Sequence, residues 1–365
     1  MKIALAETET AEVEFFEKEL GQHELEFCES ADDCSEDIDG LSIFINSKID
    51  ARFLAARPNL KLIVTRSTTY DHVDLEACGQ HGVLVSHVGG SYGDHTVPEH
   101  IFALMLALAR KLRPALMEVV SGHSFSYEAL RGVELHGRTL GVIGTGRIGR
   151  QVLKLAKAFG METIGYDSRP DRALESDLGF KYVSFAKMLK LADFVSINVP
   201  LTPATYHLFN RDTFAKCRRG MTIINTARGP IIESESLVEA LDSGIIAGAG
   251  LDVLEDERIM RKRAAHILTE QILAHLHESF APVEPLGHNA RRISEVKTIM
   301  HNNALVSHPN VIVTPHIAFN SVEAMDRINR ITVENIKAFI AGTPQNLITA
   351  PPSAPRRKRS TAPAV

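Results

Sequence analysis

Short apolar runs rich in β-branched residues alternate with amphipathic stretches along the first 90 residues. The apolar runs predict strands, and the stretches with apolar residues three and four positions apart predict helices. Strands that alternate with helices indicate βαβ units and a parallel sheet. The predicted strands are residues 2–5, 24–28, 41–45, 61–65 and 83–88, and the predicted helices are residues 11–20, 51–56 and 75–80.

A second alternating block begins at Arg138 and predicts a second parallel sheet. We therefore expect an α/β protein with two doubly wound parallel-sheet domains. The predicted strands of this block are residues 139–143, 163–166, 194–199, 222–225, 246–251 and 311–314, and its predicted helices include residues 148–158, 234–243 and 322–340.

A strongly apolar helix is predicted between the two blocks. Thr96 can cap its N-terminus, Glu99 stands three residues later as in a capping box, and Pro98 is tolerated in a first turn. Residues 101–112 are apolar nearly all round, which predicts a buried helix. This run is far shorter than the roughly 20 residues that a membrane span needs, so we expect no membrane segment.

Two segments depart from the alternation of strands and helices. Residues 258–303 are rich in Arg, His and Glu and show patches of helical periodicity, and we interpret them as an insertion at the surface. Its length would allow a lid, a dimer arm or no function at all. Residues 346–365 are rich in Pro and Ala and contain PRRKRS, so we expect a disordered basic tail. The PRRKR run is either a solvated tail or a nuclear-import or anion-binding patch.

Composition narrows the class of protein. The 365 residues, 44% of them hydrophobic, suffice for about two domains. Forty Lys and Arg against 45 Asp and Glu give a net charge of −5, which offers no bulk basic surface for nucleic acid. The first residues lack the pattern of a secretory signal. Cys28, Cys34, Cys78 and Cys217 have no zinc-ligand spacing, so we expect reduced thiols in a cytoplasmic protein.

A dinucleotide-binding pattern stands at the start of the second block. Gly144, Gly146 and Gly149 form GxGxxG after a predicted strand and at the opening of a helix, where they allow a tight turn, a close approach of phosphate and close helix packing. Asp167 ends the next strand, 18 residues after Gly149, near the spacing for an acceptor of ribose hydroxyls. This carboxylate would repel a 2′-phosphate and favours NAD over NADP, although Arg169 weakens that preference.

Three further segments follow predicted strands, where open α/β sheets bind their ligands. Arg228 follows strand 222–225, and its planar guanidinium suits a small carboxylate. Residues 252–257 are densely acidic and follow strand 246–251. His316 follows the last strand and is a candidate acid/base. Each of these residues alone could also be structural.

Together these segments resemble the D-isomer-specific 2-hydroxyacid dehydrogenase family. The matching pieces are RSTTYDHVDL (66–75), SYGDHTVPEHIFALMLALARKL (91–112), LGVIGTGRIGR (140–150), INTARGPII (224–232), AGAGLDVLEDE (247–257) and NVIVTPHIAFNS (310–321). The resemblance covers nearly the whole chain except the insertion and the tail. The SYG segment and the sequence around His316 look more like the D-lactate dehydrogenase branch than the phosphoglycerate branch.

The resemblance implies a split architecture and a homodimer. A Rossmann NAD-binding domain, residues 98–317, would be inserted into a flavodoxin-like substrate domain made of residues 1–97 and 318–345. Catalysis would take place in the cleft between the domains, where closure can exclude water. The dimer would form through the NAD domain and the helix after residue 98.

The resemblance also implies roles for individual residues. Arg228 would bind the substrate carboxylate, His316 would be the acid/base, and Glu257 would orient the His316 ring and favour its charged form. The implied substrate-binding residues are Thr68, Thr69, Tyr92 and Phe319. The implied cofactor-binding residues are Gly144, Gly146, Arg147, Ile148, Gly149, Asp167, Val199, Pro200, Thr226, Ala227 and Asp252, with Asp252 near the nicotinamide amide.

The expected activity is the NAD-dependent interconversion of a small 2-oxo acid, similar to pyruvate, and its D-2-hydroxy acid. Two alternatives stay open: an NAD(H)-responsive binding protein of the co-repressor type, and oxidation of an inorganic anion such as phosphite. No metal is expected, because the spacing of His72, His87, His95 and His100 fits no compact ligand motif.

The chain departs from the family pattern at two positions. Thr69 stands where the family usually has Gly, in a loop whose backbone N–H groups should meet the substrate carboxylate. A β-branched residue disfavours positive φ, so substrate preference could differ. Glu233 stands where Asp is commoner.

Overall fold

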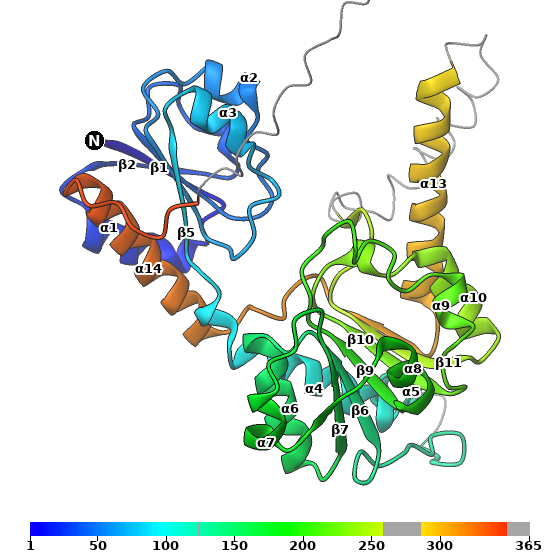
Figure 1. The fold of residues 1–365 in the computed structure, drawn as a ribbon. Helices are drawn as coiled ribbons and strands as arrows, with labels where there is room; N and C mark the ends of the chain where they lie inside the picture. The colour runs from blue at the N-terminus through cyan, green and yellow to red at the C-terminus, as the bar shows by residue number, and fades with distance from the viewer. Residues whose placement is uncertain (123–124, 258–285, 349–365) are drawn as a thin grey trace, which may run out of the picture. The chain divides into compact units, whose positions relative to one another are not determined.

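The computed structural model describes residues 1–122, 125–257 and 286–348, with side chains left out at 286–295. The described chain forms two compact units, drawn in Figure 1. The first unit contains Met1–Tyr92 and the chain from Ser321 onwards, and the second contains Gly93–Asn320. Each unit has its own parallel sheet, so the prediction of two parallel sheets in an α/β protein is confirmed.

The first unit is built on a five-stranded parallel sheet with the order β2-β1-β3-β4-β5, the flavodoxin-like arrangement. Helices α1 and α14, which come from opposite ends of the chain, lie side by side on one face (Figure 1). Helices α2 and α3 pack on the other core. The elements are β1 (Lys2–Ala6), α1 (Thr10–Leu20), β2 (Glu24–Cys28), β3 (Gly40–Ile43), α2 (Ala51–Ala55), β4 (Leu62–Thr65), α3 (Leu75–Gln80), β5 (Leu84–His87) and α14 (Val322–Ile340).

The end of the described chain corrects the predicted disordered tail. Residues 346–348 pair with β5: His87 N donates to Asn346 O at 3.1 Å, and Ile348 N donates to Val85 O at 2.8 Å. The Ile348 side chain packs against the apolar core of the first unit. The composition of the segment could not predict this pairing, because the pairing depends on the edge of a strand that is distant in sequence. The remainder of the predicted tail, residues 349–365, lies outside the described residues.

A disulfide joins Cys28 and Cys34 and overturns the prediction of four reduced thiols. Cys28 ends β2, and Cys34 follows the short 3₁₀ turn Ala31–Asp33. This turn brings the two Cα atoms to 5.7 Å, a separation typical of disulfides. Cys78 and Cys217 are free thiols.

The second unit is built on a seven-stranded parallel sheet with the order β12-β11-β10-β9-β6-β7-β8, which contains the Rossmann arrangement around β6. Helices α4, α6 and α7 contribute to one core, and α8, α9, α10 and α13 contribute to another. The elements are α4 (Thr96–Ala109), α5 (Leu112–Val120), β6 (Thr139–Ile143), α6 (Arg147–Ala158), β7 (Glu162–Tyr166), α7 (Ala173–Leu178), β8 (Lys181–Tyr182), α8 (Phe185–Leu191), β9 (Phe194–Ile197), α9 (Arg211–Phe214), β10 (Met221–Asn225), α10 (Ser234–Asp242), β11 (Ile246–Leu251), α13 (Leu286–Ser307) and β12 (Val311–Val313).

Helix α4 is buried as predicted, but its start differs. The residue before the helix is His95, and no side-chain hydrogen bond caps the N-terminus. Thr96 is already inside the helix, where its hydroxyl donates to Ala318 O at 3.4 Å. The predicted capping box is therefore wrong, because a tertiary acceptor takes the Thr96 hydroxyl. Pro98 lies in the first turn as expected.

The apolar run after α4 continues into a second helix that the sequence did not predict. Lys111 adopts a left-handed conformation with φ of 52°, which separates α4 from α5. No residue of α5 is buried. Among the described residues, no helix is both long and apolar enough to cross a membrane.

The predicted insertion is described only in part. Residues 258–285 lie outside the described chain, and residues 286–303 belong to α13, which packs against α10 and leads into β12. In Figure 1 this helix is drawn in yellow beside α10. The described part of the insertion thus forms one continuous helix, where the sequence showed only patches of helical periodicity.

Candidate active site

The GxGxxG segment forms the tight turn between β6 and α6. Gly144 has φ of +85°, and a Cβ built on it would lie 2.5 Å from Asn198 O. A Cβ on Gly149 would lie 2.0 Å from Gly144 O, so both positions require glycine. A Cβ on Gly146 would meet no atom within 4 Å, which leaves open space beside its backbone at the start of α6. This cradle fits the pyrophosphate of a dinucleotide, because the helix N-terminus offers free N–H groups.

Asp167 follows β7, and its carboxylate is held beside the glycine turn. Oδ2 accepts from Thr145 N at 2.8 Å and from Thr145 Oγ1 at 3.1 Å, and Oδ1 accepts from Arg169 N at 2.9 Å. Burial alone would raise the pKa of Asp167, but these hydrogen bonds and one from Ser168 N outweigh it and lower the pKa. Asp167 is therefore an anion at neutral pH, as its predicted role with ribose hydroxyls requires.

Other predicted cofactor residues lie around the same turn. Arg147 opens α6 and forms a two-point ion pair with Asp94, with Nη2 at 2.9 Å from Oδ2 and Nε at 3.2 Å from Oδ1. The would-be Cβ of Gly144 lies 2.8 Å from a methyl carbon of Val199, so Val199 packs directly on the turn. Ile148 is the second residue of α6, and Pro200, Thr226 and Ala227 follow β9 and β10 at the carboxyl edge of the sheet.

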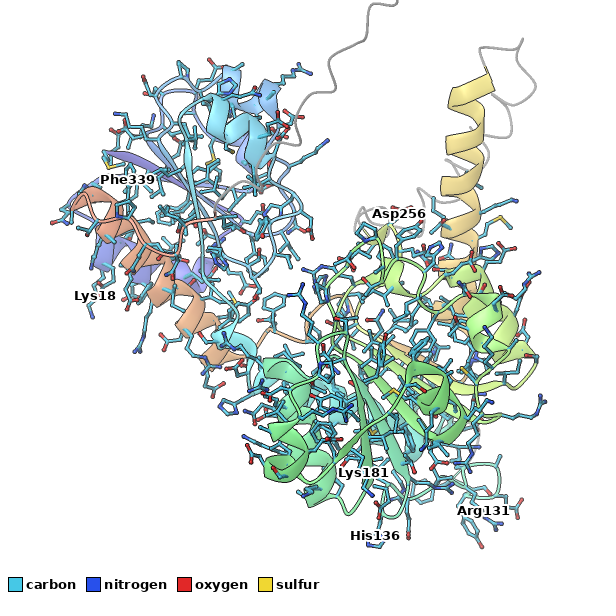
Figure 2. The ribbon with its side chains drawn as sticks, in the orientation of Figure 1. Lys18, Arg131, His136, Lys181, Asp256 and Phe339 are labelled. Atoms are coloured by element: carbon cyan, nitrogen blue, oxygen red, sulfur yellow. A yellow bond between two sulfur atoms is a disulfide. The ribbon has the colours of Figure 1, made fainter. Side chains whose placement is uncertain are left out.

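The three predicted catalytic residues follow adjacent strands. In the sheet, β11 pairs in parallel with β10 on one side and with β12 on the other. Arg228 follows β10, Glu257 follows β11, and His316 follows β12, so all three lie at the same carboxyl edge. Figure 2 shows Asp256, the neighbour of Glu257, at one end of this unit, whereas His136 lies at the other end.

The loop that carries Arg228 is fixed by Asn225, which is 1% exposed. The Asn225 amide Nδ2 donates to Arg228 O at 2.9 Å, and its Oδ1 accepts from Ala227 N at 3.0 Å. A Cβ on Gly229 would lie 2.0 Å from Leu254 O, so this loop packs directly against the loop after β11. The Arg228 Nη1 donates to Ala227 O at 2.6 Å.

His316 and Glu257 form a direct hydrogen bond, with Nδ1 of the imidazole 2.7 Å from Oε1 of the carboxylate. Their side chains are 17% and 28% exposed, so the pair remains accessible to a small molecule. The Phe319 ring stands edge-on to the His316 ring, at 6.3 Å between centroids. One ring nitrogen thus contacts a carboxylate, and an imidazole can exchange a proton through its other nitrogen.

Asp252 has contacts that the sequence did not predict. It is 1% exposed, and its carboxylate accepts from Ile317 N and Ala318 N at 2.9 Å and from Thr314 Oγ1 at 2.5 Å. Burial raises the pKa of Asp252, but hydrogen bonds from His100, Thr314 and these two amides more than offset it, and the pKa is lowered. The carboxylate therefore holds the loop that carries His316. Its contact with a nicotinamide amide stays a prediction.

The remaining predicted substrate residues belong to the first unit. Thr68 follows β4, and its hydroxyl donates to Gly89 O at 2.9 Å and lies 3.2 Å from Tyr92 Oη, which can donate to it. Tyr92 is 8% exposed. Thr69 is absent from the described non-glycine residues with positive φ, so the threonine fits its loop without that strain. The Ser67 hydroxyl donates to Thr69 O and holds the loop closed.

Comparison with known proteins identifies the chain. Residues 102–318 match the model of the D-isomer specific 2-hydroxyacid dehydrogenase, NAD binding domain. The chain belongs to this family. It is 35% identical over 300 residues to 2-hydroxyacid dehydrogenase homolog 2 of Schizosaccharomyces pombe, covering 81% of each chain. It is 32% identical over 316 residues to glyoxylate reductase of Korarchaeum cryptofilum, covering 86% of this chain and 83% of the relative.

A solved structure gives the same assignment. D-lactate dehydrogenase from Aquifex aeolicus, in a complex with NAD and lactic acid, aligns with a TM-score of 0.78 and 31% identity over 96% of this chain and 99% of that one. The protein is thus an NAD-dependent oxidoreductase of the D-2-hydroxyacid dehydrogenase family with relatives among the D-lactate dehydrogenases. The predicted family, enzyme class and cofactor are confirmed.

A second acidic contact in this dehydrogenase escaped the sequence analysis. Glu255 Oε1 lies 2.7 Å from His207 Nε2, and Oε2 accepts from Ser234 N at 2.7 Å. Asn302, on the inserted helix α13, donates to Glu255 O at 2.6 Å and accepts from the Ser234 hydroxyl at 3.0 Å. The described end of the insertion therefore supports the loop that leads to Glu257. The high density of acidic residues at 252–257 is visible in the sequence, but the partners of Glu255 could not be predicted because they are distant along the chain.

The histidines considered as metal ligands have other contacts. His72 Nε2 lies 3.3 Å from Thr65 Oγ1, and His100 Nε2 lies 3.0 Å from Thr314 Oγ1. Within the described ranges, no group of three or more His, Cys, Asp or Glu side chains is placed to hold a metal ion.

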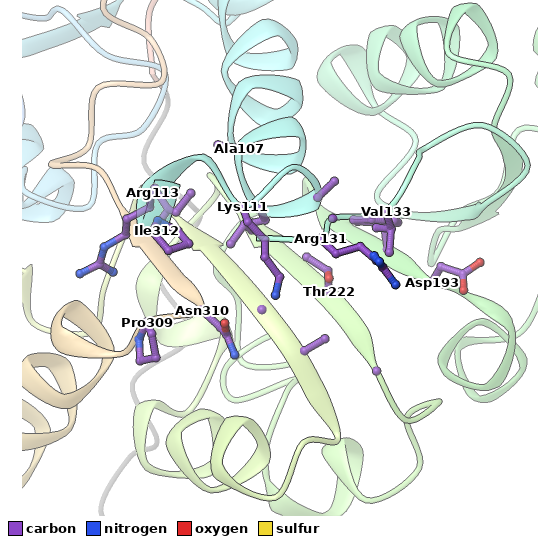
Figure 3. A pocket seen from close by; sticks show the side chains of 18 of the residues that line it. Ala107, Lys111, Arg113, Arg131, Val133, Asp193, Thr222, Pro309, Asn310 and Ile312 are labelled. Carbon is purple, nitrogen blue, oxygen red and sulfur yellow. The ribbon is translucent and has the colours of Figure 1, made fainter. Parts of the chain in front are cut away.

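A cavity of about 200 Å³ lies at the amino edge of the second sheet, between the end of α4 and the starts of β9 and β10 (Figure 3). Lys111, Arg131 and Asp193 are among its lining residues. The cavity is at the opposite edge of the sheet from Arg228, Glu257 and His316, so it is distinct from the candidate active site.

Proposed function

We propose that this dehydrogenase reduces a small 2-oxo acid of the pyruvate type to the D-2-hydroxy acid. The observation that carries the proposal is the 2.7 Å pair of His316 and Glu257 at the carboxyl edge of the sheet, where the Arg228 loop packs against the loop after β11. An acid, its orienting carboxylate and a guanidinium are the groups that this reaction needs from the protein.

His316 is the proton donor in the reductive direction. NADH would be held by the glycine turn and Asp167, and when bound it would supply a hydride for the carbonyl carbon of the substrate. Negative charge then develops on the carbonyl oxygen, and protonated His316 gives its Nε2 proton to that oxygen. Glu257 accepts from Nδ1, which fixes the orientation of the ring. In the oxidative direction, neutral His316 takes the hydroxyl proton.

Arg228 binds the substrate carboxylate. Its planar fork can hold both oxygens and so aligns the neighbouring carbonyl. Asn225 fixes the loop by bonding to the carbonyl of Arg228 and the amide of Ala227. We assign the rest of substrate binding to Thr68, Thr69, Tyr92 and Phe319. The large rings of Tyr92 and Phe319 favour a short substrate side chain. Glyoxylate and lactate, named for the relatives above, are both small acids.

The two units correspond in this proposal to two functional domains. The glycine turn and Asp167 of the second unit would hold NAD, and we assign the loop with Thr68 and Thr69, in the first unit, to substrate binding. We place the boundaries of the functional domains at residues 97/98 and 317/318, a few residues from the unit boundaries at 92/93 and 320/321.

We also propose a homodimer that uses α5. This helix has no buried residue, and four of its apolar side chains, Leu116, Met117, Val119 and Val120, are 64%, 58%, 55% and 81% exposed. Such a concentration of apolar surface on one helix is typical of a protein interface. A second copy of the chain is the simplest partner, because homodimers are the commonest oligomers.

The central experiment measures NADH oxidation with pyruvate, glyoxylate, hydroxypyruvate and longer 2-oxo acids, followed by chiral analysis of the product. We expect turnover of at least one short acid and a D product. His316→Ala should abolish turnover while NADH still binds, and Arg228→Gln should raise KM for the acid. Absence of turnover with every acid, despite tight NADH binding, would contradict the proposal.

A further inference from the structure

The loop that carries His316 is wrapped around the buried carboxylate of Asp252. Two successive backbone amides after His316, those of Ile317 and Ala318, donate to the two oxygens of this carboxylate at 2.9 Å. The amide of His316 itself donates to the backbone oxygen of Asp252, also at 2.9 Å. Asp252 therefore fixes the backbone of residues 316–318 through both its main-chain oxygen and its side-chain carboxylate.

His316 needs this support because its backbone is left-handed, with φ of 57°. L-residues other than glycine rarely adopt this conformation, and it persists only where surrounding contacts impose it. The direction of the imidazole depends on this backbone. A change in the contacts of Asp252 would therefore turn the ring away from its present position beside Glu257.

A polar chain connects Asp252 to helix α4. Thr314 Oγ1 lies 2.5 Å from Asp252 Oδ1 and 3.0 Å from His100 Nε2. A hydroxyl has one proton, and an ionised carboxylate can only accept, so the Thr314 proton goes to Asp252. Thr314 must then accept from His100, and Nε2 of His100 must carry a proton. This Nε2 also lies 3.5 Å from Asp252 Oδ1.

Helix α4 offers little other reason for a histidine at this position. Its buried residues are mostly apolar, among them Ile101, Leu104 and Met105. The His100 side chain is 19% exposed. A polar side chain among apolar neighbours is expected to have a specific partner, and its partner here is the hydroxyl that holds Asp252.

We propose that His100 is a positioning residue for His316 and acts through Thr314 and Asp252. The inference rests on the proposed function of His316 as the acid/base. His100 contacts neither the substrate nor the reacting atoms in this scheme. Its N–H orders the Thr314 hydroxyl, the hydroxyl and two amides order the Asp252 carboxylate, and that arrangement fixes the left-handed backbone of His316.

The test compares His100→Leu with His100→Gln in the full-length enzyme. Leucine removes the donor, whereas the amide of glutamine can donate at nearly the same place. We expect His100→Leu to lower kcat about tenfold or more, because small misplacements of a reacting group are costly. His100→Gln should stay within about threefold of the wild type. KM for the 2-oxo acid and Kd for NADH should change less than about threefold in both.

Thr314 supplies the matched pair of variants. Thr314→Val removes the hydroxyl at nearly constant volume, and Thr314→Ser keeps it. Thr314→Val should reproduce the loss in kcat, and Thr314→Ser should restore it. The double variant His100→Leu with Thr314→Val should be no more than about threefold slower than the slower single variant, because both changes interrupt one chain. Additive losses, or equal losses in Leu and Gln, would overturn the proposal.

A spectroscopic measurement separates this inference from the proposed function. In protein labelled with ¹⁵N-histidine, the ring resonance of His316 is identified by its loss in His316→Asn. We expect it to move in His100→Leu and Thr314→Val and to stay in place in His100→Gln. If the wild type reduces no 2-oxo acid, the proposed function fails, and the resonance still decides the positioning role. An unmoved resonance in folded His100→Leu and Thr314→Val refutes that role.

Discussion

Nδ1 of His316 lies 2.7 Å from Oε1 of Glu257, although 58 residues separate the two along the chain. We expect Glu257→Gln to lower kcat for reduction about 10- to 100-fold, because a neutral amide stabilises a protonated imidazole less than a carboxylate does. Steady-state kinetics with the best 2-oxo acid would measure this. Glu235→Gln, at an exposed acid on α10, should leave kcat unchanged. Equal activity of Glu257→Gln and the wild type would remove Glu257 from the mechanism.

Asp167 should set the preference between the two nicotinamide cofactors. We expect Asp167→Ala to raise Kd for NADH about tenfold, since a charge-assisted hydrogen bond to ribose is lost. Kd for NADPH should stay constant or fall, because the repulsion of the 2′-phosphate is removed. Fluorescence titration measures both constants, and Asp171→Ala, at an exposed nearby acid, is the control. A parallel loss of affinity for both cofactors would contradict the ribose assignment.

Asp252 should make the free energy of unfolding depend on pH in the acid range. Its pKa is lowered from the ordinary value of 3.8, because the hydrogen bonds to the carboxylate outweigh the effect of burial. The folded state therefore prefers the ionised form. This stabilisation is fully present above pH 3.8 and is lost as the pH falls through the lower folded-state pKa.

The matching variant is Asp252→Asn. Its free energy of unfolding at pH 7 should be about 1–3 kcal/mol lower than that of the wild type, as for a buried hydrogen bond to a charged group. Urea titrations at a series of pH values would show a constant difference at neutral pH that narrows below pH 3.8. A difference that stays constant to the lowest pH at which both proteins fold would show that Asp252 is not the group concerned.

The free thiols should be unreactive in the native protein. Burial raises the pKa of Cys78 to about 11 and that of Cys217 to about 12. At pH 8, only about one part in a thousand or less of either thiol is the reactive thiolate. We expect a thiol reagent to modify neither cysteine rapidly in the folded enzyme, two cysteines after denaturation, and four after denaturation and reduction. Four reactive thiols without reduction would contradict the Cys28–Cys34 disulfide.

The apolar surface of α5 should hold two copies of the chain together. Leu116→Glu combined with Met117→Glu should convert a dimer into a monomer at micromolar concentration, because charges would enter an apolar interface. Analytical ultracentrifugation measures the mass. The control is Val322→Glu, at a side chain that is 83% exposed at the start of α14. A wild-type monomer, or a dimer that survives the double substitution, would assign the α5 surface another partner.

The strands and the main helices could be predicted from the sequence because their signals are local. The bounds of β2, β6, β11, α3 and α14 agree with the predicted ranges, and the other predicted strands and helices differ by at most two residues at either end, except the apolar helix at 101–112, where α4 already ends at Ala109 and α5 begins at Leu112. The approach of His316 to Glu257 could also be anticipated, because both follow strands of one parallel sheet and matched a known family.

The features that were missed depend on distant partners. The Cys28–Cys34 disulfide requires the turn at Ala31–Asp33, and the spacing of the cysteines does not predict this turn. Thr96 resembles a cap, but the hydroxyl bonds to Ala318 instead. Asp252 is one acid among several in its segment, and only the folded loop shows that it accepts from Thr314, Ile317 and Ala318. In each case, tertiary contacts decide between local alternatives.

The pairing of residues 346–348 with β5 has a consequence for how the protein behaves at high concentration. β5 is the last strand of the first sheet, and an unprotected outer strand can recruit strands from other molecules and begin aggregation. The bonds from His87 N to Asn346 O and from Ile348 N to Val85 O occupy part of that outer side. The short segment after α14 therefore covers part of the edge strand, and truncation of the chain before Asn346 would expose an edge that favours aggregation.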